Sequence, residues 1–432
     1  MFKAIKNGNG KVALSTLCMG LGQLCYRQIG KGLLLLLIQI SGIAFFVATG
    51  GAWLRGFFTL GTIKANPAAG IAGDNSVIML ILGIFAWLLV AVYFFCWRAN
   101  IKDVYATQLA VEKGEKPSRF GADLQSLFNR NFHKAALFLP LLGVLVFTII
   151  PILFMMLIAF TNYGGEIVPP ELVRWTGFES FKRLVTLKEV APTFGRILSW
   201  NFLWAVASTA LNYFLGLLLA ILYNKKCVRG KAIWRAFPIL AYAVPGFITL
   251  LAFKFMFSYG GPINQLLTAQ GHRAIGFLDL DARWMARGIG LFVNAWISIP
   301  SSMLLATGIL SNADRGIYEA ATIDGASAYK QFTKLTLPYV LFATLPVLIT
   351  QFIGNFNNFG IFYFLRGGLY MDGYFLASDT DLLINWLYNL SIDQSYYSIG
   401  AAISIVIFAI TSVISLAVYI LSPSYRQEET YR

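Results

Sequence analysis

Long runs of apolar residues alternate with short polar segments along most of the chain. Eight of these runs come close to the ~20 residues that a helix needs to cross the hydrocarbon core of a bilayer. A β-barrel would show weak alternation over segments of about ten residues instead. The pattern predicts an all-α integral membrane protein with about eight transmembrane helices, at roughly 33–50, 77–97, 136–160, 199–223, 233–257, 286–310, 339–364 and 397–421.

The composition agrees with this class. Hydrophobic residues make up 57% of the 432 residues, and charged residues only 12%. Soluble domains have about a quarter of their residues charged, so this chain has too little polar surface to cover a globule in water. A net charge of +14 would suggest nucleic acid as the partner of a soluble protein. Because cytoplasmic loops of membrane proteins collect Lys and Arg, we expect a lipid bilayer and no nucleic acid.

The charges of the loops predict the orientation of the spans. Residues 1–32 and 224–235 each contain five basic residues and no acid. Loop 98–134 has seven basic minus four acidic residues, +3, and loop 365–396 has one minus four, −3. Since basic loops remain in the cytoplasm, this alternation predicts a multi-pass protein with both termini cytoplasmic.

The chain divides into two parts by its pattern. Residues 1–130 are expected to form a short interfacial helix within 12–32, the first two spans and a cytoplasmic loop. Residues 131–432 are expected to form a six-helix core. This core has a short external loop, 161–198, and a polar cytoplasmic loop, 313–338.

Several kinds of chemistry are missing from the sequence. No glycine-rich phosphate loop precedes a Lys-Ser or Lys-Thr pair, so the chain is not expected to bind or hydrolyse ATP. The two histidines, His133 and His272, lie far apart, which argues against a metal or catalytic site. Four cysteines lack a metal-like spacing: Cys18, Cys25, Cys96 and Cys227. Intramembrane carboxylates, which ion-coupled carriers keep, are nearly absent, so the energy for any transport must come from another chain.

The loop 313–338 lies between two apolar spans and contains Glu, Asp, Gly and Pro residues at fixed spacings. Small Ala320 and Ala321 permit a close approach to a partner, and Glu319 offers a carboxylate to a basic side chain. We expect a short helix over 313–324, which includes Asp324.

The end of this helix is also predicted. Gly325 can adopt the left-handed conformation that ends a helix. A second short helix, about 326–335, then leads to Pro338 in the first turn of the next span. The alternative is a helix-turn-helix connection without a partner, because these residue types are common in helices and turns.

Neutral amides interrupt the apolar run 339–364. Gln351, Asn355 and Asn358 follow an i, i+4, i+7 spacing and would share one helix face. Amides with aromatic rings provide what a neutral sugar needs, namely hydrogen bonds to hydroxyls and flat apolar faces. The alternative, equally supported by these residues, is hydrogen bonding between helices.

The loop pattern reads E-A-A, three residues, G, nine residues, and an apolar-x-L-P ending, with Leu335 where Ile is usual. It resembles the cytoplasmic coupling loop of binding-protein-dependent ABC importer permeases. From about 130 to its end the chain is similar to the MalF-type maltose/maltodextrin permease subunits. The matching runs, besides the loop, are Tyr242-Ala243-Val244-Pro245, Val293-Asn294-Ala295-Trp296, Asn355-Phe356-Asn357-Asn358-Phe359 and Thr380-Asp381-Leu382-Leu383-Ile384-Asn385.

The resemblance implies a type I ABC importer permease fold and import of maltose or maltodextrins by alternating access. It implies that the sugar is lined by Tyr242, Asn294, Ile297, Ser298, Ser301, Gln351, Asn355 and Asn358. It assigns contact with the ATPase to Glu319, Ala320, Ala321, Asp324, Gly325 and Pro338.

The implied partners are a second, homologous permease of the MalG type, two ATPase subunits and an external sugar-binding protein in a bacterial cell membrane. ATP and Mg²⁺ would bind the ATPase subunits, and no cofactor or metal is expected in this chain. The sequence departs from the best-known family member at Ser298, Ser301 and Gln351, where that protein has Gly, Tyr and Ser. It also lacks the large external domain of enteric members, having only 161–198 there.

Three rival functions are considered. A permease for another neutral glycan, raffinose-type or from plant walls, differs only in substrate. A membrane-embedded enzyme would need acids, His clusters or a nucleophile with its base in the spans. A membrane scaffold without transport activity predicts that the amide row is dispensable for uptake.

Overall fold

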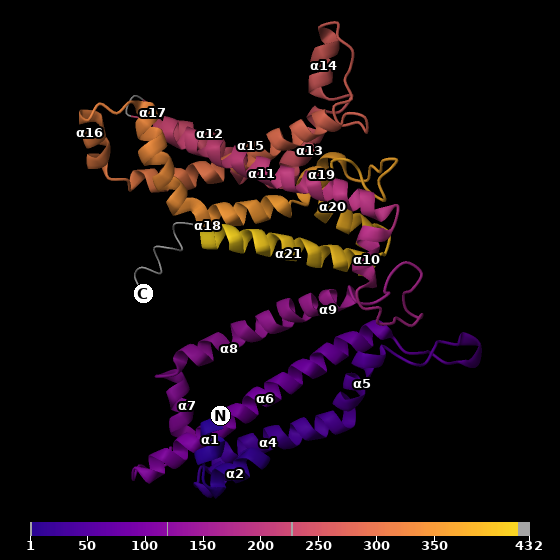
Figure 1. The fold of residues 1–432 in the computed structure, drawn as a ribbon, viewed down its shortest axis with the longest axis vertical. Helices are drawn as coiled ribbons and strands as arrows, with labels where there is room; N and C mark the ends of the chain where they lie inside the picture. The colour runs from indigo at the N-terminus through magenta and orange to yellow at the C-terminus, as the bar shows by residue number, and fades with distance from the viewer. Residues whose placement is uncertain (1, 119, 226–227, 422–432) are drawn as a thin grey trace. The chain divides into compact units, whose positions relative to one another are not determined.

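The structure is a computed structural model that describes residues 2–118, 120–225 and 228–421; Cys227 lies outside these ranges. The described residues form helices, with isolated β-bridges in place of strands (Figure 1). This confirms the predicted all-α class. The chain separates into two compact units, residues 1–177 and 178–432, and each is described by itself.

The N-terminal unit is organised around one long helix, α6, which packs against α2, α4, α5 and α9. Asn75 caps the start of α6, where its side chain accepts hydrogen bonds from the backbone N–H groups of Val77 and Ile78. The helices of this unit are α1 (Phe2–Asn7), α2 (Gly10–Leu17), α3 (Leu21–Cys25), α4 (Ile29–Phe45), α5 (Gly51–Thr59), α6 (Ser76–Glu112), α7 (Phe120–Phe128), α8 (Phe132–Val144) and α9 (Ile150–Ile158).

In the C-terminal unit, α11 packs along α15 and α18. The helices are α10 (Glu179–Thr186), α11 (Val190–Asn224), α12 (Lys231–Ala243), α13 (Gly246–Met256), α14 (Pro262–Ala269), α15 (Arg283–Ser311), α16 (Arg315–Ile323), α17 (Ala328–Gln331), α18 (Leu337–Phe356), α19 (Gly360–Arg366), α20 (Leu383–Tyr388) and α21 (Tyr397–Leu421). Short π-helical turns join α4 to α5, α8 to α9 and α17 to α18, and a fourth follows α20.

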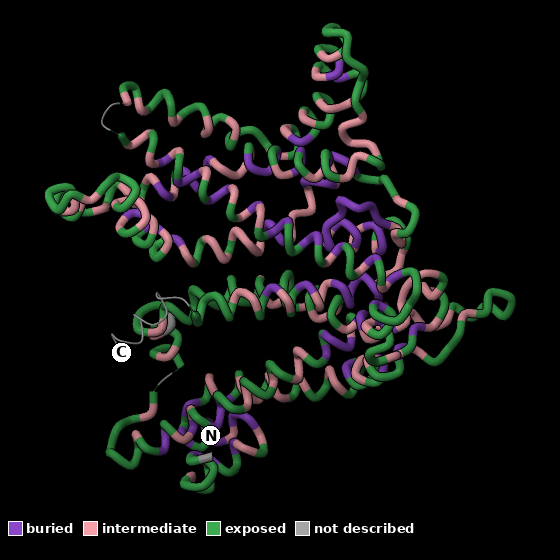
Figure 2. Tube along the Cα trace, turned by 45° about the horizontal axis from the view of Figure 1, so that its top comes forward, coloured by how far each residue is buried: buried purple, intermediate pink, exposed green. Residues whose placement is uncertain are grey.

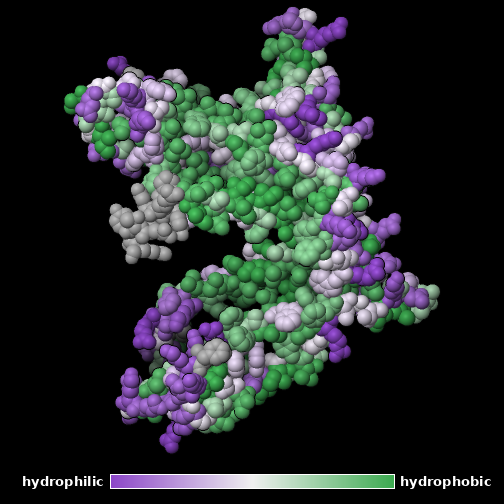
Figure 3. Space-filling view, viewed as in Figure 1, coloured by the Kyte–Doolittle hydropathy of each residue, from purple (hydrophilic) through white to green (hydrophobic). Residues whose placement is uncertain are grey.

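Within the described ranges, seven helical segments are long and apolar enough to cross a membrane, or eight when the bent pair α12 and α13 counts as one span. This confirms the prediction of about eight spans. In both units, hydrophobic side chains cover the middle of the long helices and hydrophilic ones gather at their ends (Figure 3).

Two of the predicted spans are broken. The span expected at 233–257 bends by 91° between α12 and α13. Val244 is extended there (φ −80°, ψ 133°), because a residue before proline is driven out of the helical region by Pro245. The span expected at 339–364 is interrupted after α18, where an amide side chain replaces a backbone acceptor: Asn358 Oδ1 accepts a hydrogen bond from the backbone N–H of Ile361 at 3.2 Å.

The segment 12–32 also differs from the single interfacial helix that the sequence predicts. It forms α2, α3 and the start of α4. The two short helices fold onto α6 through a buried polar cluster, in which Asn100 Nδ2 donates to the carbonyl of Ser15 at 2.8 Å and Ser15 Oγ donates to Gln23 Oε1 at 3.0 Å. Polar residues in this stretch therefore hold the first helices to α6.

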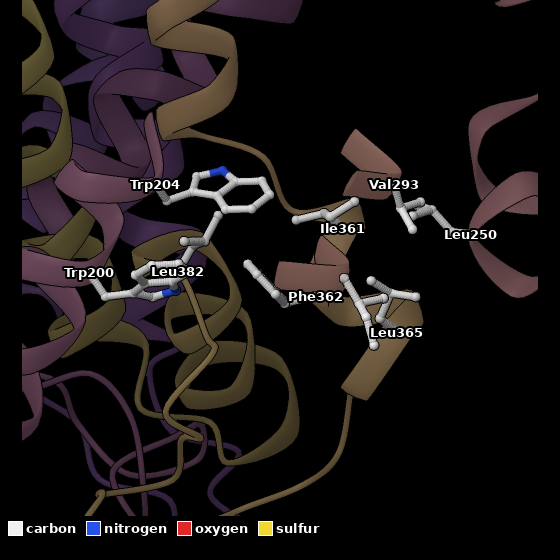
Figure 4. Close-up of a cluster of buried hydrophobic side chains, with 9 residues drawn as sticks. Trp200, Trp204, Leu250, Val293, Ile361, Phe362, Leu365 and Leu382 are labelled. Atoms are coloured by element: carbon white, nitrogen blue, oxygen red, sulfur yellow. The ribbon is translucent and has the colours of Figure 1, made fainter. Parts of the chain in front are cut away.

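Two hydrophobic clusters hold the C-terminal unit together, and Figure 2 shows where its backbone is buried. The first joins α11, α13, α15 and α19 around Trp200, Trp204 and Phe362, with Leu250, Val293, Ile361, Leu365 and Leu382 beside them (Figure 4). The second, further along α11 and α15, contains Tyr213, Leu217, Ala220, Met303, Ala306 and Val340. Together they fix the helices on which the candidate site lies.

Candidate functional site

The predicted coupling loop is a compact helical hairpin. The helix expected over 313–324 is α16, whose cap residue Asp314 accepts a hydrogen bond from the backbone N–H of Gly316 at 2.8 Å. The second helix, expected over 326–335, begins as α17 and continues through a π-helical turn into α18 without a break. Pro338 is the second residue of α18 and directly follows the π-helical turn, as expected for the start of the next span.

Gly325 makes the turn between α16 and α17. Its φ is +73°, in the left-handed region that glycine adopts at little cost. A Cβ atom added there would meet no atom within 4 Å. Only the backbone conformation therefore requires glycine at this position.

Side-chain hydrogen bonds brace the hairpin from within. Gln331 Nε2 donates to Thr322 Oγ1 at 3.0 Å and to the carbonyl of Ala326 at 3.1 Å. The hydroxyls of Tyr318 and Thr336 lie 3.2 Å apart and join α16 to the foot of α18. These bonds connect α16 to the foot of α18 and so to its span.

The outer surface of the hairpin presents unused groups. Glu319, Ala320 and Asp324 are exposed, and Ala321 is half-buried. The Glu319 carboxylate makes no ion pair or hydrogen bond with any residue that the structure describes. The carboxylate is unpaired within these residues, and Lys225, Lys231 and Arg315 line the same cavity as Glu319.

Three apolar side chains on this surface were missed by sequence reasoning. Ile317, Ile323 and Tyr329 are 53%, 86% and 76% exposed. Large apolar side chains in a polar loop are the signal that could have identified them. Full burial of one such side chain contributes ~1.5–3 kcal/mol, enough for each to matter in a contact with a partner.

A cavity of about 570 Å³ lies behind the hairpin, between α16 and the ends of α11, α12 and α15. Tyr318 and Glu319 line it from the hairpin, and Lys225, Lys231 and Arg315 add positive charge.

The predicted amides come together in an inter-helix chain of hydrogen bonds. Asn358 Nδ2 donates to Asn294 Oδ1 at 3.1 Å, and Asn294 Nδ2 approaches Asn355 Oδ1 at 3.5 Å. Asn355 Nδ2 donates to Thr209 Oγ1 at 2.9 Å. We call Thr209, Asn294, Asn355 and Asn358 the amide chain; it joins α11, α15 and the end of α18.

The helical spacing explains only part of this arrangement. Asn358 lies beyond the end of α18, so it does not continue the face of Gln351 and Asn355 as predicted. It returns to them through Asn294 because the chain breaks there, and its Oδ1 accepts from the backbone N–H of Ile361 at 3.2 Å. The break places Asn358 next to α15.

The other predicted lining residues vary in position. Ile297, Ser298 and Ser301 are half-buried and follow Asn294 along one face of α15. Gln351 Nε2 donates to Ser302 Oγ at 3.2 Å, which ties α18 to α15. Tyr242 lies on α12, is 57% exposed and has no hydrogen bond among the described residues, so it is not joined to the amide chain.

Polar residues of α11 were also missed. Trp204 Nε1 donates to the carbonyl of Asn355, and Asn201 Nδ2 to that of Phe356, each at 3.1 Å. Asn201, Ser208 and Asn212 are buried polar residues at spacings of 7 and 4. That spacing places them on one helix face and could have predicted their role.

Several buried polar atoms of α11, α15 and α18 have no hydrogen-bond partner within the described ranges. They include Ser208 Oγ and Asn212 Oδ1 on α11, Thr307 Oγ1 on α15 and Gln351 Oε1 on α18. Each such group costs ~1–3 kcal/mol. Water or the hydroxyls of a ligand would satisfy them.

The loop at the far end of α11 and α15 carries a buried charge cluster. Arg366 and Asp379, both 0% exposed at their side chains, form an ion pair at 2.9 Å. Burial raises the pKa of the nearby Asp381 carboxyl to about 6. This loop, acidic by sequence, thus uses two of its acids inside the fold.

Comparisons with known proteins agree with this geometry. Residues 212–427 match the family described as binding-protein-dependent transport system inner membrane component. The chain is 34% identical to the galactooligosaccharides transport system permease protein GanP of Bacillus subtilis over 96% of this chain and 98% of that protein. It is 33% identical to the maltodextrin transport system permease protein MalC of Streptococcus pneumoniae, over 96% of both chains.

A solved structure has the same fold. It is a bacterial ABC transporter involved in the import of the acidic polysaccharide alginate, with a TM-score of 0.56 at 20% identity. The likeness covers 70% of this chain and 98% of that one. It supports the predicted type I ABC importer permease fold.

Proposed function

Because the chain belongs to the family of binding-protein-dependent transport system inner membrane components, and its relatives include permeases of oligosaccharide transport systems, we propose that it imports maltodextrins by alternating access. The observation that carries the transport mechanism is the coupling hairpin. We infer that this hairpin is the binding surface for a separate ATPase. The inference rests on its motif, its braced turn at Gly325 and the unpaired Glu319 carboxylate.

The proposed orientation follows from the loop charges. Both termini and the hairpin are cytoplasmic, and the loop 365–396 is external. Two ATPase subunits bind ATP and Mg²⁺. One contacts the hairpin of this chain, and the other contacts the equivalent hairpin of a second, homologous permease. A sugar-binding protein delivers the substrate from outside.

The proposed sugar path runs between α11, α15 and α18. The amide chain and the unpartnered oxygens of Ser208, Thr307 and Gln351 offer neutral hydrogen-bonding groups. Sugar hydroxyls both donate and accept, so they can replace the bonds that these groups make with each other. Neutral amides without a nearby charge favour a neutral glycan, and the similarity to MalC over 96% of both chains favours maltodextrin.

A second candidate substrate is a galactooligosaccharide, favoured by the 34% identity to GanP. The transport mechanism would be the same for this substrate. A galactooligosaccharide differs from a maltodextrin in the orientation of its pyranose hydroxyls. The sequence-based alternatives, raffinose-type or plant-wall glycans, belong to the same class of neutral oligosaccharides.

The test is ATPase activity of the assembled complex in lipid, with the binding protein, over maltose, longer maltodextrins, galactooligosaccharides, raffinose and an unrelated glycan. We expect the maltodextrin series to stimulate hydrolysis most. Stimulation by galactooligosaccharides alone would select the second candidate. If no sugar stimulates hydrolysis, the proposed transport function is wrong.

A further inference from the structure

A cavity outside the proposed sugar path lies where α11 and α15 begin. Its volume is about 840 Å³, and three guanidinium groups line it, from Arg196, Arg283 and Arg287. No carboxylate lines it. We call it the arginine pocket; its other lining residues are Pro192, Gly195, Ser199, Trp200, Leu203 and Tyr374.

The aromatic rings of the pocket hold the arginines in place. The Arg287 guanidinium lies 3.8 Å from the ring centre of Trp200, and that of Arg196 lies 5.3 Å from the ring centre of Tyr374. Stacking uses the flat face of a guanidinium and leaves its edge N–H groups available. These ring faces are therefore occupied and poorly placed to stack a sugar.

The positive charges of the pocket are incompletely neutralised. The Asp379 carboxylate pairs with Arg283 at 2.9 Å but also with the buried Arg366. Arg196 and Arg287 donate to the backbone carbonyls of Gly373 and Asp379. Neither has a carboxylate within ion-pair distance in the part of the chain that the structure describes. The pocket is thus suited to an anion with several acceptor oxygens.

An apolar stripe continues from the pocket along α11. Arg196, Ser199, Leu203, Val206 and Ala210 are spaced by 3, 4, 3 and 4 residues and share one exposed or half-exposed face. Leu203 is 53% and Val206 45% exposed. This face of α11 therefore has a cationic residue, Arg196, at one end and the apolar residues Leu203 and Val206 along its length. Such a face is complementary to a lipid with an anionic headgroup and an acyl chain.

We propose that the arginine pocket binds the phosphate of an anionic phospholipid, whose acyl chain lies along the stripe of Leu203 and Val206. The phosphate oxygens accept hydrogen bonds from the edges of Arg196, Arg283 and Arg287. A zwitterionic lipid is disfavoured because its cationic headgroup would meet three guanidiniums. The site is independent of which sugar is carried.

The test is native mass spectrometry of the full-length chain in its assembled complex. The complex is taken from nanodiscs of phosphatidylcholine with a minor share of phosphatidylglycerol. The variants are Arg196→Gln, on an exposed helix face, and Arg287→Gln, with melting temperatures recorded for both. The matched control is Arg273→Gln, an exposed arginine without a hydrogen bond or ion pair in the described ranges. We expect phosphatidylglycerol retention to fall about tenfold in the two pocket variants and to remain unchanged in the control.

Equal retention in all variants would overturn the proposal. Millimolar inorganic phosphate is the second arm: if it binds at Arg196 while no phosphatidylglycerol is retained, the pocket serves free phosphate and the lipid assignment is wrong. A third arm measures affinity for the binding protein. If Arg196→Gln weakens that affinity and leaves lipid retention unchanged, the ligand is an acidic side chain, and the proposal fails.

Discussion

The coupling hairpin and the amide chain handle polar groups in opposite ways. The hairpin uses a few internal hydrogen bonds, such as those of Gln331, and leaves Glu319 and Ile323 exposed. In the amide chain, Asn294 and Asn355 are 4% and 8% exposed and bond to each other and to neighbouring helices. One region leaves its polar and apolar groups exposed, and the other uses its amides to hold the helices together.

This difference has a mechanical consequence. Under the proposed mechanism, bonds inside the hairpin keep it rigid while the ATPase moves, and the bond between Tyr318 and Thr336 links it to α18. Under the same proposal, bonds in the amide chain are exchanged for bonds to sugar hydroxyls, and this exchange sets how easily the helices part. Changes in the hairpin should therefore abolish coupling, and changes in the amide chain should shift stability and affinity.

The largest effect is expected from Gly325→Val. A β-branched residue is strained at a φ of +73°, and the left-handed region costs roughly 1–2 kcal/mol even for ordinary residues. We expect uptake to fall about tenfold or more with normal membrane insertion. Gly325→Asn is the control, because Asn tolerates this region and its Cβ has free space. Normal uptake by the Val variant would remove the basis for the coupling role.

The next largest effect is expected from Ile323→Asp. Ile323 is 86% exposed, and loss of its burial against a partner would weaken association with the ATPase about tenfold. Co-purification of the ATPase with the permease measures this. Leu266→Asp is the matched control, since Leu266 is 65% exposed on α14, away from the hairpin. Equal losses in both variants would contradict a specific contact at Ile323.

A smaller, discriminating effect is expected from Asn355→Leu compared with Thr209→Val. Both remove the 2.9 Å bond between these side chains and should lower stability by ~1–3 kcal/mol at most. If Asn355 also contacts sugar, only Asn355→Leu raises the KM for uptake. Identical kinetics in the two variants would assign Asn355 to helix packing alone.

The smallest effect on uptake is expected at Asp381, whose change alters the pH dependence of stability instead. Burial raises the pKa of its carboxyl from 3.8 to about 6, so between these values the folded protein holds a proton that the unfolded chain has lost. Stability from this group is therefore lost as pH rises through that window, by about 3 kcal/mol at most. Asp381→Asn should melt above the wild type at about pH 8 and equally at about pH 4. A constant difference at both pH values would contradict this.

The two regions also differ in how much the sequence predicts. The hairpin is local: its helix, its glycine turn and its proline follow from neighbouring residues, and α16 and Gly325 lie where expected. The amide chain depends on tertiary structure. Thr209 comes from a distant helix, and Asn358 joins only because α18 ends before it.

The break in the span at Val244 and Pro245 was partly predictable from the sequence, less so than the hairpin but more so than the amide chain. The effect of proline on the preceding residue was readable from the sequence, but the apolar run around it favoured one continuous span. The sequence also predicts a single interfacial helix within 12–32. The bonds from Ser15 and Gln23 to Asn100, which fold this segment onto α6, could not be predicted because they connect positions far apart in sequence. Helices were predictable, and the contacts that bend or bury them were not.

The most direct test of the coupling role is cross-linking from position 323. In a background with the four cysteines replaced by serine, a cysteine is introduced by Ile323→Cys or, as a control, by Leu266→Cys. We expect Ile323→Cys to cross-link to an ATPase subunit in the assembled complex, and Leu266→Cys not to do so. Cross-linking from position 266 but not from 323 would contradict both the predicted orientation and the coupling role of the hairpin.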